Sequence, residues 1–193
     1  MEKINFQKTL DGLKEIGFNP IPSLVQVAIP EAKETLARGL QFYISDVAWL
    51  PEYSEVAEWL TDNKGRGLLC YGNCGRGKTV ICKKIIPLLL NHYHGKIVSC
   101  YDAQDINKDI DGIKSKHIIC IDDIGVEKES VKYGEKRMAF PEIVDECEKR
   151  GHLLIATTNL SLNEIADKYG ERTMDRLVAI TKRVEFKGKS LRG

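Results

Sequence analysis

The segment that most constrains this chain is Gly72-Asn73-Cys74-Gly75-Arg76-Gly77-Lys78-Thr79. It fits the pattern G-x-x-x-x-G-K-[ST], in which glycines let the backbone turn so tightly that successive N–H groups face one concavity. A helix that begins at the end of such a loop adds the positive end of its dipole. The segment, with Val80 after it, therefore predicts a loop that binds the phosphates of a nucleotide.

The residues on either side of the loop support this interpretation. The apolar run Leu68-Leu69-Cys70-Tyr71 precedes it, as a buried strand would, and apolar residues at helical spacing follow it as far as Leu90. Lys78 then supplies a charge for the β- and γ-phosphates, and the Thr79 hydroxyl is a ligand of Mg²⁺. The alternative is a glycine-rich turn without a nucleotide, which has no need of Lys78 and Thr79.

Composition is that of an ordinary globular domain. The chain has 193 residues, of which 42% are hydrophobic and 30% charged. No run approaches the ~20 apolar residues of a membrane-spanning helix, and the N-terminus lacks the apolar stretch of a signal peptide. We therefore expect a cytoplasmic protein with no membrane partner. The net charge of +1 does not by itself indicate a nucleic-acid-binding protein.

The six cysteines form no C-x-x-C pair and show no spacing typical of a zinc site. Most of them lie in apolar, strand-like runs, so we expect small buried hydrophobes in the reduced state. The alternative is a redox or metal role for Cys70 and Cys74, which flank the end of the expected first strand.

Residues 1–64 predict a helical N-terminal extension with a proline-containing connector. Apolar residues recur at helical spacing within three segments, 1–18, 31–50 and 52–63. Residues 19–30 contain several prolines, which favour an extended connector.

From residue 65 to residue 193 the pattern alternates between strands and helices, which favours a parallel sheet with helices on both faces. The expected strands are 68–71, 96–101, 118–122, 152–157 and 182–186. The expected helices are 78–93, 103–110, 134–150, 162–168 and 171–179. Pro141 predicts either a kink in the third of these helices or a helix that begins there. Ser161-x-x-Glu164 is a capping box for the fourth.

Two carboxylates follow the apolar run Ile118–Ile121. A buried parallel strand carries its last residues to the carboxyl edge of the sheet, where open α/β sheets bind their ligands. We expect Asp122 to hold Mg²⁺, directly or through water. Asp123, on the opposite face of the strand, is the candidate to orient or deprotonate an attacking water. The alternative is a strand end with two solvated acids.

Three further polar residues are candidates for the same site. Asn159 ends the fourth expected strand, where it can bond the γ-phosphate or the attacking water, although a turn with a capping Asn gives the same pattern. Arg172 and Arg176 lie four residues apart on an expected helix, hence on one face. Either they are solvated or paired with nearby acids, or one of them is an arginine finger for the γ-phosphate of a neighbouring subunit.

In their order and spacing, Gly72–Thr79, Ile118–Gly125, Thr157–Leu160 and Tyr169–Leu177 resemble the AAA+ ATPases of the DnaC/DnaI type, the bacterial and phage replicative-helicase loaders. The transposase-helper ATPases of the IstB type are close relatives. The resemblance covers about residues 65–193. It implies an α/β P-loop NTPase fold of the AAA+ kind, a three-layer sandwich with a five-stranded parallel sheet of order 5-1-4-3-2 and no C-terminal lid domain.

The resemblance also implies a function. ATP and Mg²⁺ bind between subunits and drive assembly of a homo-oligomeric ring or spiral, and hydrolysis is slow until a partner stimulates it. Arg176 is then the arginine finger and Arg172 its support. The implied partners are a replicative DNA helicase and single-stranded DNA or, for an IstB-like protein, a transposase.

This chain departs from the family pattern in three places. Asp123 stands where many AAA+ proteins have Glu, and the segment 102–117 is shorter than the element with which loaders contact DNA. Residues 1–64 do not resemble the usual helicase-binding domain, so the helix of 1–18 is either a reduced partner-binding element or a helix packed on the core. Besides a loader and a transposase helper, a nucleotide-gated binding module with little hydrolysis therefore stays open. A small-molecule kinase fits less well, because neither a lid nor a second substrate pocket is evident.

Overall fold

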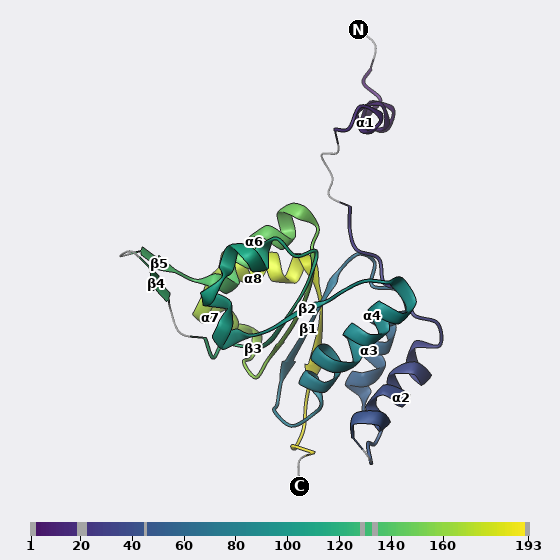
Figure 1. Ribbon diagram of the computed structural model, residues 1–193, viewed down its shortest axis with the longest axis vertical. Coiled ribbons are helices and arrows are strands. Elements are labelled where there is room, and N and C mark those ends of the chain that lie inside the picture. Colours follow the sequence, from purple (N-terminus) through teal and green to yellow (C-terminus); the bar gives the residue numbers. More distant parts are fainter. Residues whose placement is uncertain (1–2, 19–22, 45, 128–129, 133–134, 192–193) are drawn as a thin grey trace.

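The computed structural model describes residues 3–18, 23–44, 46–127, 130–132 and 135–191. Its centre is a five-stranded parallel sheet of order β2-β3-β6-β1-β7 (Figure 1). The strands are β1 Gly67–Gly72, β2 Ser99–Asp102, β3 Ile118–Ile124, β6 Leu153–Thr158 and β7 Thr181–Phe186. Numbered among themselves, these strands run 5-1-4-3-2, which confirms the expected order.

Helices cover both faces of this sheet (Figure 1). One face carries α2 Ala32–Tyr43, α3 Pro51–Thr61, η1 Val80–Ile85 and α4 Ile86–His94. The other carries η2 Ala103–Lys108, α5 Ile110–Lys114, α6 Ala139–Arg150, α7 Leu162–Tyr169 and α8 Glu171–Ile180. Leu68 and Cys70 belong to the first apolar cluster and Leu69 to the second, because successive side chains of a strand point to opposite faces. Burial on both faces explains why the strands read as continuous apolar runs.

The N-terminal helix α1 (Phe6–Glu15) stands apart from this body in Figure 1, and none of its residues is buried. Its amphipathic pattern was correctly predicted, but the packing on the core that we considered for it is not seen. By contrast, Leu36 of α2 and Leu60 of α3 share one apolar cluster with the sheet. The domain boundary after residue 64 stays a prediction. None of the described helices is long and apolar enough to cross a membrane.

Several of the predicted helices differ from those observed. The helix expected over 31–50 ends at Tyr43. The helix expected over 134–150 begins only at Ala139, and residues 135–137 instead form β5 (Glu135–Arg137), antiparallel to β4 (Ser130–Lys132). Pro141 lies in the first turn of α6, where a backbone N–H has no partner within the helix. Of the two predictions made for Pro141, the helix that begins near it is therefore confirmed, and the kink within a longer helix is wrong. The capping box at Ser161 and Glu164 is confirmed.

The helix that follows the phosphate loop changes to a π-helix after its first residues. Residues Val80–Ile85 form a π-helix, and the N–H of Ile86 donates to the carbonyl of Ile81, five residues back. In an α-helix Pro87 would clash with the carbonyl four residues before it. The wider π turn relieves that clash, which explains why the long helix predicted over 78–93 divides into η1 and α4.

Candidate functional site

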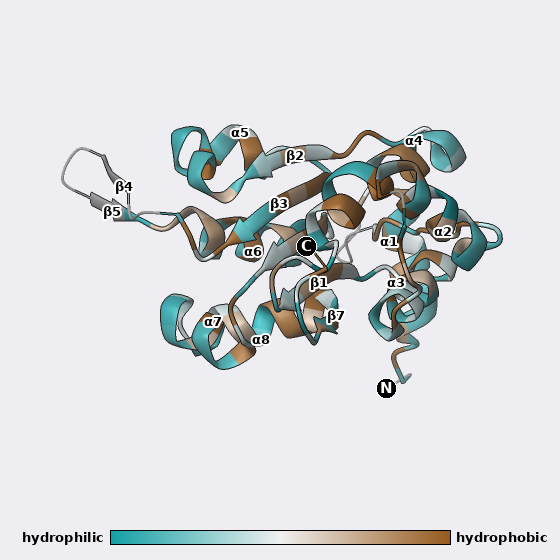
Figure 2. Cartoon of the chain, turned by 90° about the horizontal axis from the view of Figure 1, so that it is seen from below, coloured by the Kyte–Doolittle hydropathy of each residue, from teal (hydrophilic) through white to brown (hydrophobic). Residues whose placement is uncertain are grey.

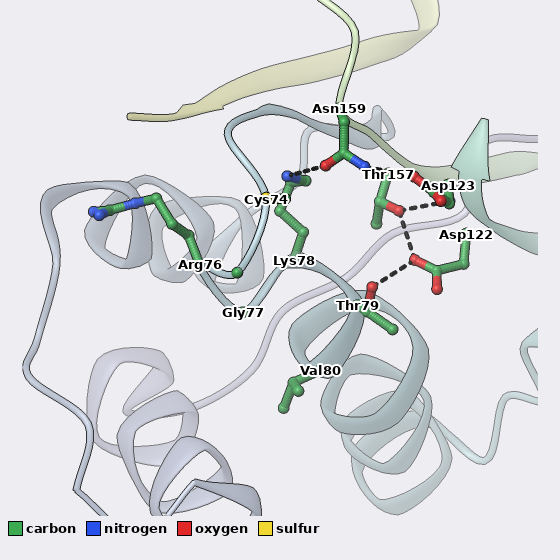
Figure 3. Close-up of a pocket in the computed structure, with 11 residues that line it drawn as sticks. Cys74, Arg76, Gly77, Lys78, Thr79, Val80, Asp122, Asp123, Thr157 and Asn159 are labelled. Carbon is green, nitrogen blue, oxygen red and sulfur yellow. Dashed lines mark hydrogen bonds between the residues drawn. The ribbon is translucent and has the colours of Figure 1, made fainter. Parts of the chain in front are cut away.

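The carboxyl ends of β1, β3 and β6 meet at one edge of the sheet around a cavity of about 170 Å³ (Figure 3). Its lining consists of Cys74, Gly75, Arg76, Gly77, Lys78, Thr79, Val80, Asp122, Asp123, Thr157 and Asn159. The strand order explains this convergence, because β6 lies between β1 and β3. Whole small-molecule pockets measure ~300–1,000 Å³, so this cavity suits the phosphate end of a nucleotide rather than all of it.

The glycines of the loop have the backbone conformations that the motif requires. Gly72, Gly75 and Gly77 have φ of 102°, 72° and 90°, in the left-handed region that glycine tolerates best. A Cβ at Gly75 would lie 2.0 Å from Oγ of Ser190. The residue at that position is therefore fixed both by its backbone and by the close approach of the C-terminal segment.

Lys78 is buried and its ammonium group faces three oxygen atoms. Nζ donates to the carbonyls of Gly72 and Asn73, at 2.7 Å each, and to Oδ1 of Asn159 at 3.0 Å. These contacts occupy all three donors of a lysine. Burial lowers the pKa of Lys78. An incoming phosphate can therefore bind Lys78 only by replacing at least one of these acceptors.

The Thr79 hydroxyl and the Asp122 carboxylate, the two groups predicted to hold Mg²⁺, are in direct contact. Thr79 Oγ1 donates to Oδ1 of Asp122 at 3.0 Å, and Thr157 Oγ1 donates to the same oxygen at 2.5 Å. Figure 3 shows the three side chains converging beside Lys78. Within the described ranges, no three His, Cys, Asp or Glu residues are grouped to hold a metal. This arrangement fits Mg²⁺, which commonly takes few protein ligands and completes its shell with waters and substrate phosphates.

Asp123 lies in the cavity beside Asp122, and the prediction that it faces the opposite side of the strand is wrong. Its φ is +62°, and the pairing of β3 with β6 shifts register between Ile121 and Ile124. The backbone is therefore not extended here, and the alternation of side chains breaks. Such strained conformations cluster at functional sites. Burial and the charge of Asp122 raise the pKa of Asp123.

Asn159 and Thr157 link the acids to the phosphate loop (Figure 3). Asn159 accepts from Lys78 and donates through Nδ2 to Oδ1 of Asp123 at 2.9 Å. Thr157 Oγ1 accepts the backbone N–H of Asp123 at 2.8 Å while it donates to Asp122. The sequence pointed to Asn159, whereas the role of Thr157 was missed. The only sequence feature that could have indicated this role is the position of Thr157 near the end of the fourth expected strand, two residues before Asn159.

Arg76 is among the residues that line the cavity, but its guanidinium points away from Lys78 (Figure 3). Nε and Nη2 each lie 2.6 Å from Oε1 of Glu52, and Nη1 donates to the carbonyl of Lys189 at 3.1 Å. Tyr53 donates its hydroxyl to the carbonyl of Arg76 at 3.1 Å. Arg76 thus fastens the loop to α3 and to the C-terminal segment. Sequence reasoning missed Glu52 and Tyr53, since no local pattern joins them to the loop.

Arg172 and Arg176 do not line the cavity. The Arg176 guanidinium pairs with Asp145 and, through Nε at 2.8 Å, with Glu148, both on α6. Arg172 is exposed. A finger would act on a neighbouring subunit, so this role stays a prediction for both arginines.

A phosphate loop after β1, paired acids at the end of β3 and a polar residue after β6, on a 5-1-4-3-2 sheet, define the P-loop fold in its AAA+ arrangement. More particularly, the chain belongs to the family described as novel STAND NTPase 3 (nSTAND3), whose model matches residues 50–188. No curated protein has a sequence that matches this chain.

Solved structures confirm the expected likeness to DnaC/DnaI-type proteins at the level of the fold. The DnaC helicase loader is 15% identical with a TM-score of 0.61, and the match covers 75% of this chain and 95% of that one. DnaI is 19% identical with a TM-score of 0.55, over 75% of this chain and 90% of that one. AMPPCP-bound DnaA from Aquifex aeolicus is 18% identical with a TM-score of 0.55, over 75% of this chain and 50% of the chain in that structure.

Proposed function

We propose that this protein is an ATP-driven switch that binds ATP with Mg²⁺ at the carboxyl edge of β1, β3 and β6 and hydrolyses it slowly. The observation that carries the proposal is the continuous contact from Lys78 through Asn159 to Asp123. It joins the phosphate-binding lysine to the candidate base through one amide. The Asn159 amide can therefore change its contact with Asp123 when a γ-phosphate draws Lys78 away from it.

The side chains of this chain have separate tasks in that scheme. Lys78 leaves Asn159 or a loop carbonyl and bonds the β- and γ-phosphates. Asp123 accepts a proton from the attacking water, and Asn159, released from Lys78, positions that water or the γ-phosphate. Thr157 keeps both acids in place. Mg²⁺, when held by Thr79 and Asp122, neutralises charge on the phosphates.

The biological task that we propose is that of a replicative-helicase loader in the cytoplasm. The support for it is the fold shared with the DnaC helicase loader and DnaI, together with the sequence resemblance over about 65–193. ATP would assemble the protein into a homo-oligomer, with single-stranded DNA as a further ligand. The runner-up is an IstB-like transposase helper, and a nucleotide-gated binding module with little hydrolysis is third.

Calorimetric titration with Mg²⁺ and ATP tests the site. The Lys78→Ala variant should lose at least 100-fold in affinity, about 2.7 kcal/mol, because the phosphates lose their buried counter-charge. Lys116→Ala, at an exposed position before β3, is the matched control and should bind like the unaltered protein. Equal affinity of the Lys78 variant and the control would overturn the proposal.

Affinity capture from native extract tests the biological task. The bait is the Asp123→Asn variant with ATP and Mg²⁺, because slow turnover prolongs the ATP-bound state; the control bait is Lys78→Ala. Recovery of a replicative helicase with the first bait alone supports the loader, and recovery of a transposase favours the runner-up. If the cellular function survives in an Asp123→Ala strain, hydrolysis is not required and the binding module takes first place.

A further inference from the structure

Four cysteine thiols form a row on the face of the sheet that η1 and α4 cover. They belong to the elements that build the nucleotide site: Cys70 to β1, Cys82 to η1, Cys100 to β2 and Cys120 to β3. Sγ of Cys82 lies 3.5 Å from Sγ of Cys70, and Sγ of Cys120 lies 3.4 Å from the carbonyl oxygen of Cys82. All six cysteines of the chain, these four included, are free, and Cys70, Cys82 and Cys120 are buried. As predicted, most of the cysteines are therefore small buried residues.

Cys100 differs from the other members of the row because it is only half-buried. It lies on β2, which forms one edge of the sheet. Cys100 and Cys120 are register partners in the parallel pair β2–β3, so their side chains leave the sheet on the same face. Neighbouring strands lie ~4.7–4.9 Å apart, within the ~4.4–6.8 Å between Cα atoms that a disulfide spans. The separation of Cys100 and Cys120 across the two strands is therefore one that a disulfide can span.

The surroundings of Cys100 also favour reaction. The hydrogen bond from the thiol of Cys120 and the nearby ammonium of Lys83 lower the pKa of Cys100 to about 7. The thiolate is the nucleophilic form of cysteine. Cys147, by contrast, is 1% exposed, and burial raises its pKa to about 12. One thiol of the chain is thus accessible and activated next to a buried partner, while Cys147 is inert.

We propose that Cys100 and Cys120 form a site of reversible oxidation by small hydroperoxides, and that the resulting disulfide weakens nucleotide binding at the phosphate loop. The Cys100 thiolate attacks the terminal peroxide oxygen, the O–O bond breaks, and hydroxide or alkoxide leaves, so that Cys100 becomes a sulfenic acid. The sulfur of Cys120 then attacks Cys100, the S–O bond breaks, and water leaves with the thiol proton. Two thiols lose two electrons in total, and the peroxide gains them.

The link to the loop runs through the carbonyl of Cys82. In the π-helix the N–H of Ile86 already donates to Ile81, and Pro87 has no N–H with which to continue the pattern to Cys82. Sγ of Cys120 lies 3.4 Å from that acceptor, and its single S–H proton is shared between this carbonyl and the sulfur of Cys100. A disulfide at Cys120 has no S–H, so the buried carbonyl three residues after Thr79 loses this donor, which is costly in a protein interior. This second part rests on the proposed nucleotide function.

The experiment treats the full-length reduced protein with hydrogen peroxide, blocks remaining thiols with N-ethylmaleimide and maps peptides by mass spectrometry. A Cys100–Cys120 disulfide that dithiothreitol reverses is expected, with Cys147 fully alkylated after unfolding as the internal control. The Cys120→Ser variant should instead leave a sulfenic acid on Cys100 that dimedone traps. Cys74, which is exposed, is followed on its own peptide.

Calorimetry with Mg²⁺ and ATP then compares reduced and oxidised protein. Oxidation should lower the affinity by about 3- to 10-fold, with recovery after reduction, and Cys100→Ser should show no peroxide-dependent loss beyond that caused by Cys74. The absence of the Cys100–Cys120 disulfide overturns the oxidation site. A mapped disulfide with unchanged affinity overturns its link to the loop. If reduced protein binds no ATP while the disulfide forms, the nucleotide function fails and the oxidation site stands.

Discussion

Arg76 of the phosphate loop and Glu52 of α3 form an almost completely buried ion pair, in which Nη2 of Arg76 lies 2.6 Å from Oε1 of Glu52. The two residues are 8% and 4% exposed. Arginine in a phosphate loop suggests a contact with phosphate, but here the guanidinium is used up by Glu52 and by the carbonyl of Lys189. The Arg76 side chain therefore holds the loop against α3 and the C-terminal segment, on the side away from the cavity. Lys78 is then the loop side chain that supplies positive charge to the cavity.

Glu52→Ala should destabilise the protein and weaken nucleotide binding. Removal of one partner leaves a buried, uncompensated charge, which typically costs about 3–5 kcal/mol. The double variant Glu52→Leu/Arg76→Met should recover most of that loss, because no unpaired charge then remains. Urea unfolding gives the free energies, and titration with ATP gives the affinities.

Glu55→Ala, on the same helix at an exposed position, is the control and should change the free energy of unfolding by less than about 0.5 kcal/mol. Equal stabilities of the Glu52 and Glu55 variants would contradict the anchoring role of the pair.

Asn159→Ala should separate nucleotide binding from hydrolysis. The variant loses the amide that connects Lys78 to Asp123 but keeps the loop, Thr79 and Asp122. We expect the affinity for ATP to stay within about threefold and the hydrolysis rate to fall about 10²–10³-fold, as on loss of one positioned polar group. Single-turnover phosphate release measures the rate. Asn163→Ala, at an exposed position of α7, is the matched control, and an equal rate in both variants would remove Asn159 from the site.

The local sequence predicted those parts of the site that depend on short stretches of chain. Residues 72–79 carry their own glycines, lysine and threonine, and Asp122 follows an apolar run that could only be a buried strand. Figure 2 shows this strand, β3, as hydrophobic along most of its length and hydrophilic at its tip. The sheet order came from the family resemblance, and it brings Asn159 beside both segments.

What could not be predicted depends on contacts between distant residues or on local strain. The prediction that Asp123 faces the opposite side of the strand assumed an extended backbone. Nothing in the run Ile118–Asp122 indicates the left-handed conformation of Asp123 or the register shift beside it. Glu52 looked like an ordinary acid in the first turn of a helix, and only the packing of α3 brings it to Arg76. Residues 135–137 were assigned to a helix because the apolar pattern of α6 was extended too far towards the N-terminus.

Hydrolysis should depend on pH through Asp123. A base must be ionised, and burial together with the charge of Asp122 raises the pKa of Asp123 above the ordinary value of about 3.9. The rate should therefore be constant at high pH and fall, as pH decreases, at a higher pH than an exposed Asp would give. The Asp123→Asn variant should be slow and should lack this acid limb. A pH–rate profile at saturating ATP is the measurement.

The same pKa can be followed without turnover by carbon-13 NMR of the nucleotide-free protein. Asp122→Asn should lower the pKa of Asp123, because it removes the neighbouring negative charge. The value should remain above that of an exposed Asp, since burial is the larger cause and is unchanged. A pKa for Asp123 that does not respond to Asp122 would mean that the two carboxylates do not share one cavity in solution.

Arg176 has two roles that one experiment can separate. Within the chain it pairs with Asp145 and Glu148 of α6, so Arg176→Ala should lower the free energy of unfolding by about 1 kcal/mol or less, as for partly exposed ion pairs. As an arginine finger it would act on the neighbouring subunit, and its loss should reduce hydrolysis about 10³-fold or more while ATP binding persists.

Mixing inactive variants tests the second role. In a 1:1 mixture of Arg176→Ala and Lys78→Ala subunits, about a quarter of the head-to-tail interfaces pair an intact phosphate loop with an intact arginine, so measurable hydrolysis should return. A mixture of Lys78→Ala with Asp123→Asn is the control and should stay inactive, because no interface then has a complete loop and base. If the first mixture also stays inactive although mixed oligomers form, Arg176 serves only to hold α8 against α6.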